Sequence, residues 1–274
     1  MDLRSYIESE LEEDAALPGG GAVARTDDGG YPGDPAVHVP ESEVDAAVVT
    51  VRAAGGEQQA YLARPRDGRP APAVVVVHEN KGLVPYITDT TRRLAAAGYV
   101  ALAPDLLSPV GGTGAFGTQE EVIAALAGID GADVVADVRA AVGWLADQEF
   151  VVADRIAVLG FCYGGGIAWR TLTEEPRLAT GVPFYGPIPD LDAVPGITAP
   201  VLAVYGENDQ RITGMLPAIR EAMAEHGKTF EPVVLEGAGH AFHNDTNPDR
   251  YQPEAARQAW QAALDWLDRW LRPR

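Results

Sequence analysis

The stretch RIAVLGFCYGG, residues 155–165, joins an apolar run to a helix-like stretch through a Gly-x-Cys-x-Gly turn. At such a strand-to-helix turn the nucleophile holds a strained backbone angle, and the flanking glycines let strand and helix pack closely. The side chain of Cys162 should then project above a sheet, where the helix N-terminus favours a thiolate or an oxyanion. This geometry suits acyl transfer, whereas a small buried hydrophobe is the alternative for a lone cysteine.

Apolar runs and helix-like stretches alternate on both sides of this turn, and strands that alternate with helices indicate a parallel sheet. Helices are expected over about 86–97, 119–147 and 213–226 and after Cys162. The further expected strands are APAVVVVHE (71–79), YVALAPDLL (99–107), ATGVPFYG (179–186), APVLAVYG (199–206) and FEPVVLEG (230–237).

Two further runs, DAAVVTVRA (45–53) and EQQAYLARP (57–65), flank the turn signal AGG and predict an antiparallel hairpin. The expected fold class is therefore α/β, a mostly parallel sheet with helices on both faces and an N-terminal antiparallel hairpin. The closing segment, 251–272, predicts a helix whose core-facing stripe is Ala256, Trp260, Ala263, Leu267 and Trp270.

The N-terminal part of the chain has a different character. Helical spacing of apolar residues over 3–13 predicts a short acidic helix with the stripe Leu3, Tyr6, Ile7 and Leu11. Residues 14–45 are rich in Gly, Pro and Asp and predict an arm that caps a pocket or mediates dimerisation. The predicted organisation is a helix and extended arm over 1–45 and a catalytic domain over 46–274.

Composition excludes several classes of protein. The formal net charge of −19 would repel nucleic-acid phosphates and anionic membrane surfaces. A single cysteine excludes an intrachain disulfide framework and a cysteine-rich metal site. The longest apolar stretch, 71–79, is too short to span a bilayer, and the acidic N-terminus has no apolar signal segment. The expected location is the cytoplasm.

A thiol nucleophile needs a base within hydrogen-bond reach and an acid that orients the base. Asp209 follows the expected strand 199–206 and His240 follows 230–237, so the chain order is nucleophile, acid, histidine, as in α/β-hydrolases. Glu207 competes as the acid and His243 as the base. The remaining histidines have surface or packing explanations: His38, His78 and His226.

Over about 45–272 the chain resembles the dienelactone hydrolases (carboxymethylenebutenolidases) of the α/β-hydrolase superfamily. The motifs that carry the resemblance are HENKGL (78–83), APDLL (103–107), GFCYGG (160–165), PFYGP (183–187), GENDQ (206–210) and GHAFHN (239–244). The resemblance implies that Glu79 contacts the resting thiol and accepts its proton, although a strand-end ion pair is an alternative for Glu79. It also implies an oxyanion hole formed by the backbone N–H groups of Asn80 and Tyr163.

The chain also departs from this family. Dienelactone hydrolases hold the substrate carboxylate with arginines shortly after the fourth strand and shortly after the catalytic histidine. Here those neighbourhoods read LLSPVGG and HAFHND, without an arginine, which argues against an anionic dienelactone as the preferred substrate. Arg211 could reach the site or form a surface salt bridge. Pocket walls are expected from Tyr86, Phe116, Tyr185 and Phe242, for each of which core packing is the alternative.

The expected function is hydrolysis of small esters or lactones through a thioester on Cys162, with His240 and Asp209 completing a triad and no cofactor. The alternatives are an acyltransferase, and a non-catalytic ligand receptor or thiol redox sensor on the same fold. The expected partner is a small-molecule ester or lactone, with no nucleic acid or membrane and with a homodimer as an option.

Overall fold

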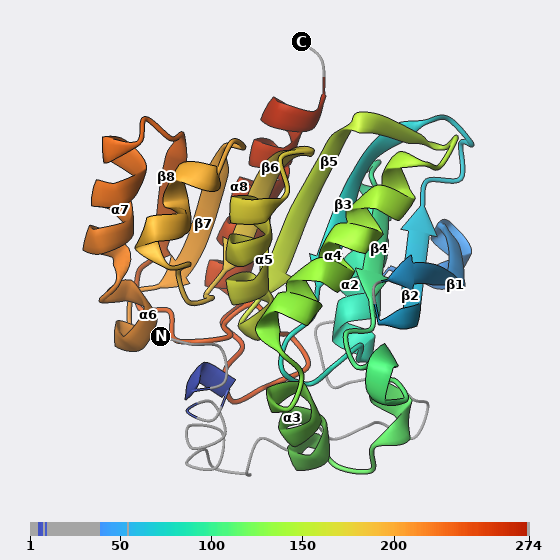
Figure 1. Cartoon of the computed structure of the whole chain (residues 1–274), viewed down its shortest axis with the longest axis horizontal. Coiled ribbons are helices and arrows are strands. Elements are labelled where there is room, and N and C mark those ends of the chain that lie inside the picture. The colour runs from blue at the N-terminus through green and yellow to red at the C-terminus, as the bar shows by residue number, and fades with distance from the viewer. Residues whose placement is uncertain (1–4, 8, 10–38, 54, 273–274) are drawn as a thin grey trace.

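Each apolar run that was predicted to be a strand forms one in the computed structural model, which describes residues 5–7, 9, 39–53 and 55–272 (Figure 1). Within these residues the strands form one eight-stranded sheet of order β1-β2-β4-β3-β5-β6-β7-β8. The strands are β1 (Asp45–Ala53), β2 (Gly56–Arg64), β3 (Ala71–Val77), β4 (Val100–Pro104), β5 (Val151–Phe161), β6 (Leu178–Phe184), β7 (Val201–Gly206) and β8 (Phe230–Leu235).

Strand pairing confirms the predicted hairpin and the mostly parallel sheet. β1 pairs with β2, and β2 with β4, in antiparallel fashion. All other pairs, from β4–β3 to β7–β8, are parallel. The carboxyl ends of β3, β5, β7 and β8 therefore lie along one edge of the sheet, which is where ligand sites form in α/β proteins.

The helices confirm the alternation with strands. They are α2 (Pro85–Ala96), α3 (Gln119–Ala127), α4 (Gly131–Ala146), α5 (Tyr163–Glu174), α6 (Gln210–Thr213), α7 (Leu216–Glu225) and α8 (Pro253–Leu271), with short 3-10 turns η1 (Glu41–Glu43), η2 (Ser108–Val110), η3 (Thr113–Ala115) and η4 (Leu191–Gly196). The predicted helical stretch 119–147 divides in two, because Thr118 caps α3 and Asp130 starts α4 by accepting from the Ala132 N–H at 2.8 Å.

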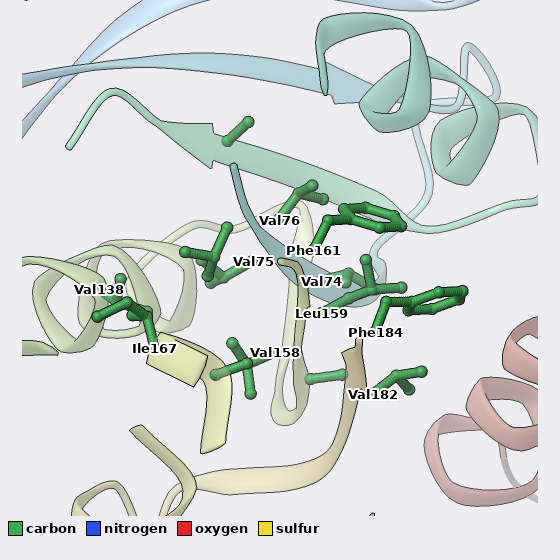
Figure 2. Close-up of a cluster of buried hydrophobic side chains, with 14 of the residues drawn as sticks. Val74, Val75, Val76, Val138, Val158, Leu159, Phe161, Ile167, Val182 and Phe184 are labelled. Carbon is green, nitrogen blue, oxygen red and sulfur yellow. The ribbon is translucent and has the colours of Figure 1, made fainter. Parts of the chain in front are cut away.

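The core lies between the central strands and the two helical layers. Val74, Val76 and Val158 are fully buried, as expected for strands covered on both faces. Figure 2 shows Val138 of α4 and Ile167 of α5 on one side of the strands and the red helix α8 on the other. This packing holds the ends of β3, β5 and β6 rigidly below the candidate site.

The closing helix departs from its prediction in one respect. Ala256, Ala263 and Leu267 are buried and Trp260 packs against the core, as the stripe predicts. The prediction that Trp270 belongs to the core is wrong, because this side chain is 39% exposed. The neighbouring turn buries Trp266 and Leu271 instead, so the buried face lies slightly to one side of the predicted stripe.

The N-terminal helix is partly visible. Residues 5–7 and 9 are helical, and Tyr6 and Ile7 are buried. Leu3, Leu11, His38 and residues 14–38 of the expected arm lie outside the described residues, so the division into 1–45 and 46–274 stays a prediction. None of the helices that the structure describes is long and apolar enough to cross a membrane.

Candidate functional site

Cys162 lies in the turn between β5 and α5 with a strained backbone. Its φ and ψ are 54° and −119°, values that cost a residue other than glycine about 1–3 kcal/mol. Hydrogen bonds hold this conformation: its N–H donates to the Phe184 carbonyl at 3.0 Å, and its carbonyl accepts from the Gly165 N–H at 2.9 Å. The turn therefore places the only cysteine of the chain at the N-terminus of α5, with 3% of it exposed.

The glycines of the turn are required by close backbone contacts. A Cβ on Gly160 would lie 2.1 Å from the Gly164 carbonyl oxygen. A Cβ on Gly164 would lie 2.3 Å from the carbonyl oxygen of Val77 and 2.5 Å from that of His78. The first turn of α5 consequently packs directly against the end of β3.

This contact brings the two expected oxyanion donors to one place. Asn80 follows β3, and Tyr163 is the first residue of α5, where a backbone N–H has no acceptor within the helix. Asn80 and Cys162 line the same small pocket. Among the described residues, no backbone acceptor in a turn or cap takes the N–H of Asn80 or Tyr163.

His240 and Asp209 form a buried pair beside Cys162. The Nδ1–H of His240 donates to Oδ2 of Asp209 at 2.5 Å, and their side chains are 4% and 3% exposed. Burial alone would lower the pKa of His240, but hydrogen bonds with Asp209 and Cys162 raise this pKa to about 9. The arrangement stabilises the imidazolium that forms when the histidine takes a proton.

Glu79 is buried at the end of β3 and is held by an asparagine that the sequence reasoning did not assign. Nδ2 of Asn244 donates to Oε2 of Glu79 at 2.6 Å, and the Thr246 hydroxyl donates to Oδ1 of Asn244 at 2.7 Å. Nδ1 of His78 donates to the Glu79 carbonyl at 2.7 Å, while Nε2 accepts from the Leu106 N–H. His78 thus has a packing role and fixes the backbone that carries Glu79.

The two competing residues have other partners. Nδ1 of His243 accepts from the Tyr86 hydroxyl at 2.6 Å, and its ring stacks on Phe161. Burial and the charge of Arg93 lower the pKa of His243 to about 3, so this histidine stays neutral. Glu207 is exposed, and its Oε2 accepts from the Gly237 N–H at 2.9 Å. Neither residue joins the pair that contacts Cys162.

The segment 236–252 carries His240 and Asn244 without a helix or strand, and a buried ion pair between Asp245 and Arg93 attaches it to α2. Nε of Arg93 donates to Oδ2 of Asp89 at 2.7 Å, and Nη2 of Arg93 donates to Asp245. Burial alone would lower the pKa of Arg93, but the charges of Asp245 and Asp89 raise it. Arg93 therefore stays charged and fixes this segment to the rest of the protein.

The expected pocket walls fall into two groups. Tyr185 lies against the His240 ring at a centroid distance of 5.1 Å, and Phe242 packs against Tyr185 at 5.5 Å. Tyr86 packs against Phe161 and His243. Phe116 is partly buried against the core after η3 and takes no part in these contacts.

An arginine that the sequence reasoning missed lines the same pocket as the nucleophile. Arg250 lines a pocket of about 10 Å³ together with Cys162, Glu79 and Lys81. The motifs next to β4 and His240 lack arginine, yet the segment 236–252 places Arg250 at the pocket of Cys162. Its position in NPDRY, ten residues after His240, offered only its charge as a signal.

Tyr6 is a second contact that the sequence reasoning missed. Its hydroxyl oxygen lies 3.5 Å from Sγ of Cys162 and 3.4 Å from Nε2 of His240. The guanidinium of Arg211 lies over the Tyr6 ring, 4.7 Å from its centre. Arg211 thus reaches the site through Tyr6. The only signal in the sequence was the apolar stripe of the N-terminal helix.

The polar side chains around Cys162 are of several chemical kinds. No group of three or more His, Cys, Asp or Glu side chains within the described residues could hold a metal ion. The polar groups around Cys162 are instead a carboxylate, an imidazole, backbone N–H groups and cationic side chains. Such a set can activate a nucleophile and stabilise a developing oxyanion.

Two curated proteins are similar to this chain over most of its length. A protein of Methylorubrum extorquens named "Putative carboxymethylenebutenolidase" is 34% identical over 81% of this chain and 80% of its own length. A Bradyrhizobium protein named "Probable 2-oxo-3-(5-oxofuran-2-ylidene)propanoate lactonase" is 38% identical over 79% of this chain and 90% of its own length.

Solved structures agree with these sequences. The crystal structure of a "Putative Dienelactone Hydrolase" from Klebsiella pneumoniae superposes with a TM-score of 0.76 at 31% identity, covering 82% of this chain and 98% of that one. This similarity confirms the expected α/β-hydrolase fold. Residues 58–271 match the dienelactone hydrolase family. The chain therefore belongs to the dienelactone hydrolase family and is a hydrolase of the α/β-hydrolase superfamily.

Proposed function

We propose that this protein hydrolyses small esters or lactones through a thioester on Cys162. The observation that carries the proposal is the hydrogen bond of 2.5 Å between His240 and Asp209, next to a cysteine in a strained strand-to-helix turn. A nucleophile, a base and an orienting acid within hydrogen-bond reach form the arrangement that covalent catalysis requires.

In acylation, Sγ of Cys162 bonds to the carbonyl carbon while Glu79 or His240 takes the thiol proton. The raised pKa of His240 favours this transfer, since its protonated form is stabilised. The N–H groups of Asn80 and Tyr163 donate to the oxyanion, a contribution of about 2.7–4 kcal/mol per donor in related chemistry. The carbon–oxygen bond then breaks, and the leaving oxygen receives a proton from His240.

In deacylation, neutral His240 accepts a proton from a water molecule that attacks the thioester carbonyl. The carbon–sulfur bond breaks, the acid leaves, and the proton returns to the sulfur of Cys162. Asp209 keeps Nδ1 of His240 protonated, so that Nε2 is the atom that exchanges protons with substrate and water. If His240 takes the thiol proton, this proton passes to the leaving oxygen. If Glu79 takes it, the leaving oxygen receives the proton that His240 already carries, and Glu79 returns its proton to the sulfur after the carbon–sulfur bond breaks.

Two of the three charged side chains that line the pocket of Cys162 are cationic, which favours a substrate that carries a carboxylate. Arg250 and Lys81 line the pocket with Cys162, and a guanidinium binds a carboxylate through two parallel hydrogen bonds. The Bradyrhizobium relative is named as the lactonase of such an acid. We therefore propose, against the expectation drawn from the missing arginines beside β4 and His240, that an anionic lactone is accepted and that Arg250 binds its carboxylate.

A rapid-quench reaction with p-nitrophenyl acetate, followed by intact-protein and peptide mass spectrometry, tests the proposal. An acetyl adduct on Cys162 should form in a burst and then clear as acetate, and Cys162→Ala should form none. In His240→Ala the adduct should persist if it forms, because deacylation lacks its base. A folded protein with no adduct and no turnover would contradict the proposal, and transfer of acetyl to an added alcohol in preference to water would indicate an acyltransferase.

A further inference from the structure

The side chain of Tyr6 presents a phenol to the two reacting groups of the site. Its oxygen is 3.5 Å from Sγ of Cys162, 3.4 Å from Nε2 of His240 and 3.4 Å from the carbonyl oxygen of Tyr185. These contacts join residues that are 156 to 234 positions apart in the chain. The tyrosine is fully buried, so it fills space at the centre of the site and not at its margin.

The ring of Tyr6 has a defined environment as well. The guanidinium of Arg211 lies 4.7 Å from the ring centre, and the His240 ring meets it edge-on at 6.4 Å. Arg211 also donates to the Ser9 hydroxyl, which donates to the Tyr6 carbonyl at 2.7 Å. One arginine therefore holds both the ring and the backbone of this helical turn.

The phenol stays neutral in this position. Burial and the neighbouring Cys162 raise the pKa of Tyr6 well above its ordinary value of 10.0. A neutral phenol has the composition of the alcohol that an aryl ester releases after its oxygen has received a proton. Tyr6 is thus a chemical stand-in for a leaving group, supplied by the chain itself.

We propose that Tyr6 occupies the leaving-group subsite in the resting protein, and that this subsite takes a planar phenol, which displaces Tyr6. This inference rests on the proposed function and names the class of ester. In that mechanism the leaving oxygen is bonded to the carbon on Sγ and receives a proton from Nε2 of His240. The Tyr6 oxygen contacts the same Nε2 and the Sγ to which that carbon bonds, and the attached ring marks where the leaving group extends, beneath Arg211.

The charge of Arg211 should make the subsite prefer an aromatic leaving group to a saturated one. A guanidinium over a ring face attracts the electron-rich face of an aromatic or conjugated group, whereas a saturated alkyl group has no such face. Occupation by Tyr6 also lowers the apparent affinity for any ligand in proportion to the time that the subsite is filled. Removing the Tyr6 side chain should therefore expose Cys162 and strengthen phenol binding.

Alkylation of Cys162 by iodoacetamide tests the inference without any need for turnover. Tyr6→Ala should be alkylated roughly tenfold faster than wild type or more, since Tyr6 leaves the subsite empty for about a tenth of the time or less. Tyr6→Phe retains the ring and should stay close to wild type. Ile7→Ala is the matched control, because it removes a buried side chain from the same helical turn. A rate for Tyr6→Ala equal to that of wild type would overturn the inference.

Protection by added alcohols tests the chemical class. Phenol should slow alkylation of Tyr6→Ala roughly fivefold more than cyclohexanol at equal concentration, and Arg211→Gln in the Tyr6→Ala background should abolish this difference. Equal protection by the two alcohols would overturn the assignment. If Tyr6→Ala does not fold, Arg211→Gln alone, which releases both the ring and Ser9, should show the faster alkylation.

Kinetics separate this inference from the proposed function. With phenyl acetate, Tyr6→Ala should lower KM, while Cys162→Ala should abolish turnover. A fall in kcat for both Tyr6→Ala and Tyr6→Phe, with alkylation unchanged, would make Tyr6 a proton donor to the leaving group and would overturn the inference. Absence of turnover in wild type would contradict the proposed function, yet the alkylation and phenol results would still report on the subsite.

Discussion

Nδ2 of Asn244 donates to Oε2 of Glu79 at 2.6 Å, which links the segment after β8 to the end of β3. Two hydrogen bonds from Thr246 fix the amide of Asn244. The N–H of Thr246 donates to Oδ1 of Asn244 at 3.1 Å, and the Thr246 hydroxyl donates to the same oxygen at 2.7 Å. The position of the Glu79 carboxylate beside the pocket of Cys162 therefore depends on a residue that lies 165 positions later in the chain.

Replacement of Asn244 by alanine should lower kcat/KM for p-nitrophenyl acetate by roughly 10- to 100-fold, because a hydrogen bond to a charged group contributes about 1.5–3 kcal/mol. Thr246→Val removes one of the two bonds to Oδ1 of Asn244 and should have a smaller effect. Steady-state kinetics on both variants, with thermal unfolding as the folding control, measure this. Full activity of a folded Asn244→Ala protein would exclude a positioning role for Asn244.

The pKa of His240 predicts how stability depends on pH. This pKa rises from 6.5 to about 9 on folding, so the folded protein holds the proton more tightly than the unfolded chain. The resulting stabilisation, on the order of 3 kcal/mol, is fully present below about pH 6.5 and is lost as pH rises through about 9. Urea unfolding of wild type and His240→Gln between pH 6 and 10 should show their difference shrinking across this range. A difference that does not vary with pH would contradict the prediction.

Gly164→Ala should destabilise the protein by about 3 kcal/mol or more, since its Cβ would lie 2.3 Å from a backbone oxygen of β3 that cannot move aside. Gly114→Ala is the matched control, because a Cβ there meets no atom within 4 Å. Chemical denaturation gives both values. Comparable stability of the two variants would show that the contact between α5 and β3 can relax.

Arg250→Gln should raise KM for a lactone that carries a carboxylate by roughly 10- to 100-fold, the effect expected when a charged hydrogen-bonding partner is lost. KM for a neutral ester should change far less. Arg257→Gln removes an exposed arginine that pairs with Glu254, and controls for the change in net charge. If both substrates lose affinity equally in Arg250→Gln, the arginine supports the pocket structurally and does not bind the carboxylate.

The sequence predicted the fold and the positions of Cys162, Asp209 and His240 because these follow from local signals. Each of the three residues comes directly after, or a few residues beyond, a strand of the parallel part of the sheet, and the carboxyl ends of parallel strands lie along one edge of a sheet. The catalytic roles of these residues stay predictions until the kinetic experiments are done. What the fold adds is the pairing of His240, and not His243, with Asp209.

Other contacts could not be predicted, since no local pattern encodes them. Tyr6 was recognised only as part of an apolar helical stripe, and its contact with His240 spans 234 positions. Arg250 lies in an irregular segment whose path is set by burial of its neighbours and not by periodicity. The placement of Trp270 in the core was wrong for a related reason: helical spacing identifies a face, but neighbouring elements decide where along that face burial ends.

The ion pairs of Arg93 with Asp89 and Asp245 have a consequence for the working lifetime of the enzyme. On heating, an irregular segment ordinarily unfolds locally before the rest of a domain. Activity is then lost while most of the protein is still folded. Here the segment with His240, Asn244 and Arg250 is fastened to α2 by charges that are costly to separate once buried. On heating, activity and global structure should therefore be lost in the same unfolding transition. The residual activity then equals the fraction of molecules that are still folded.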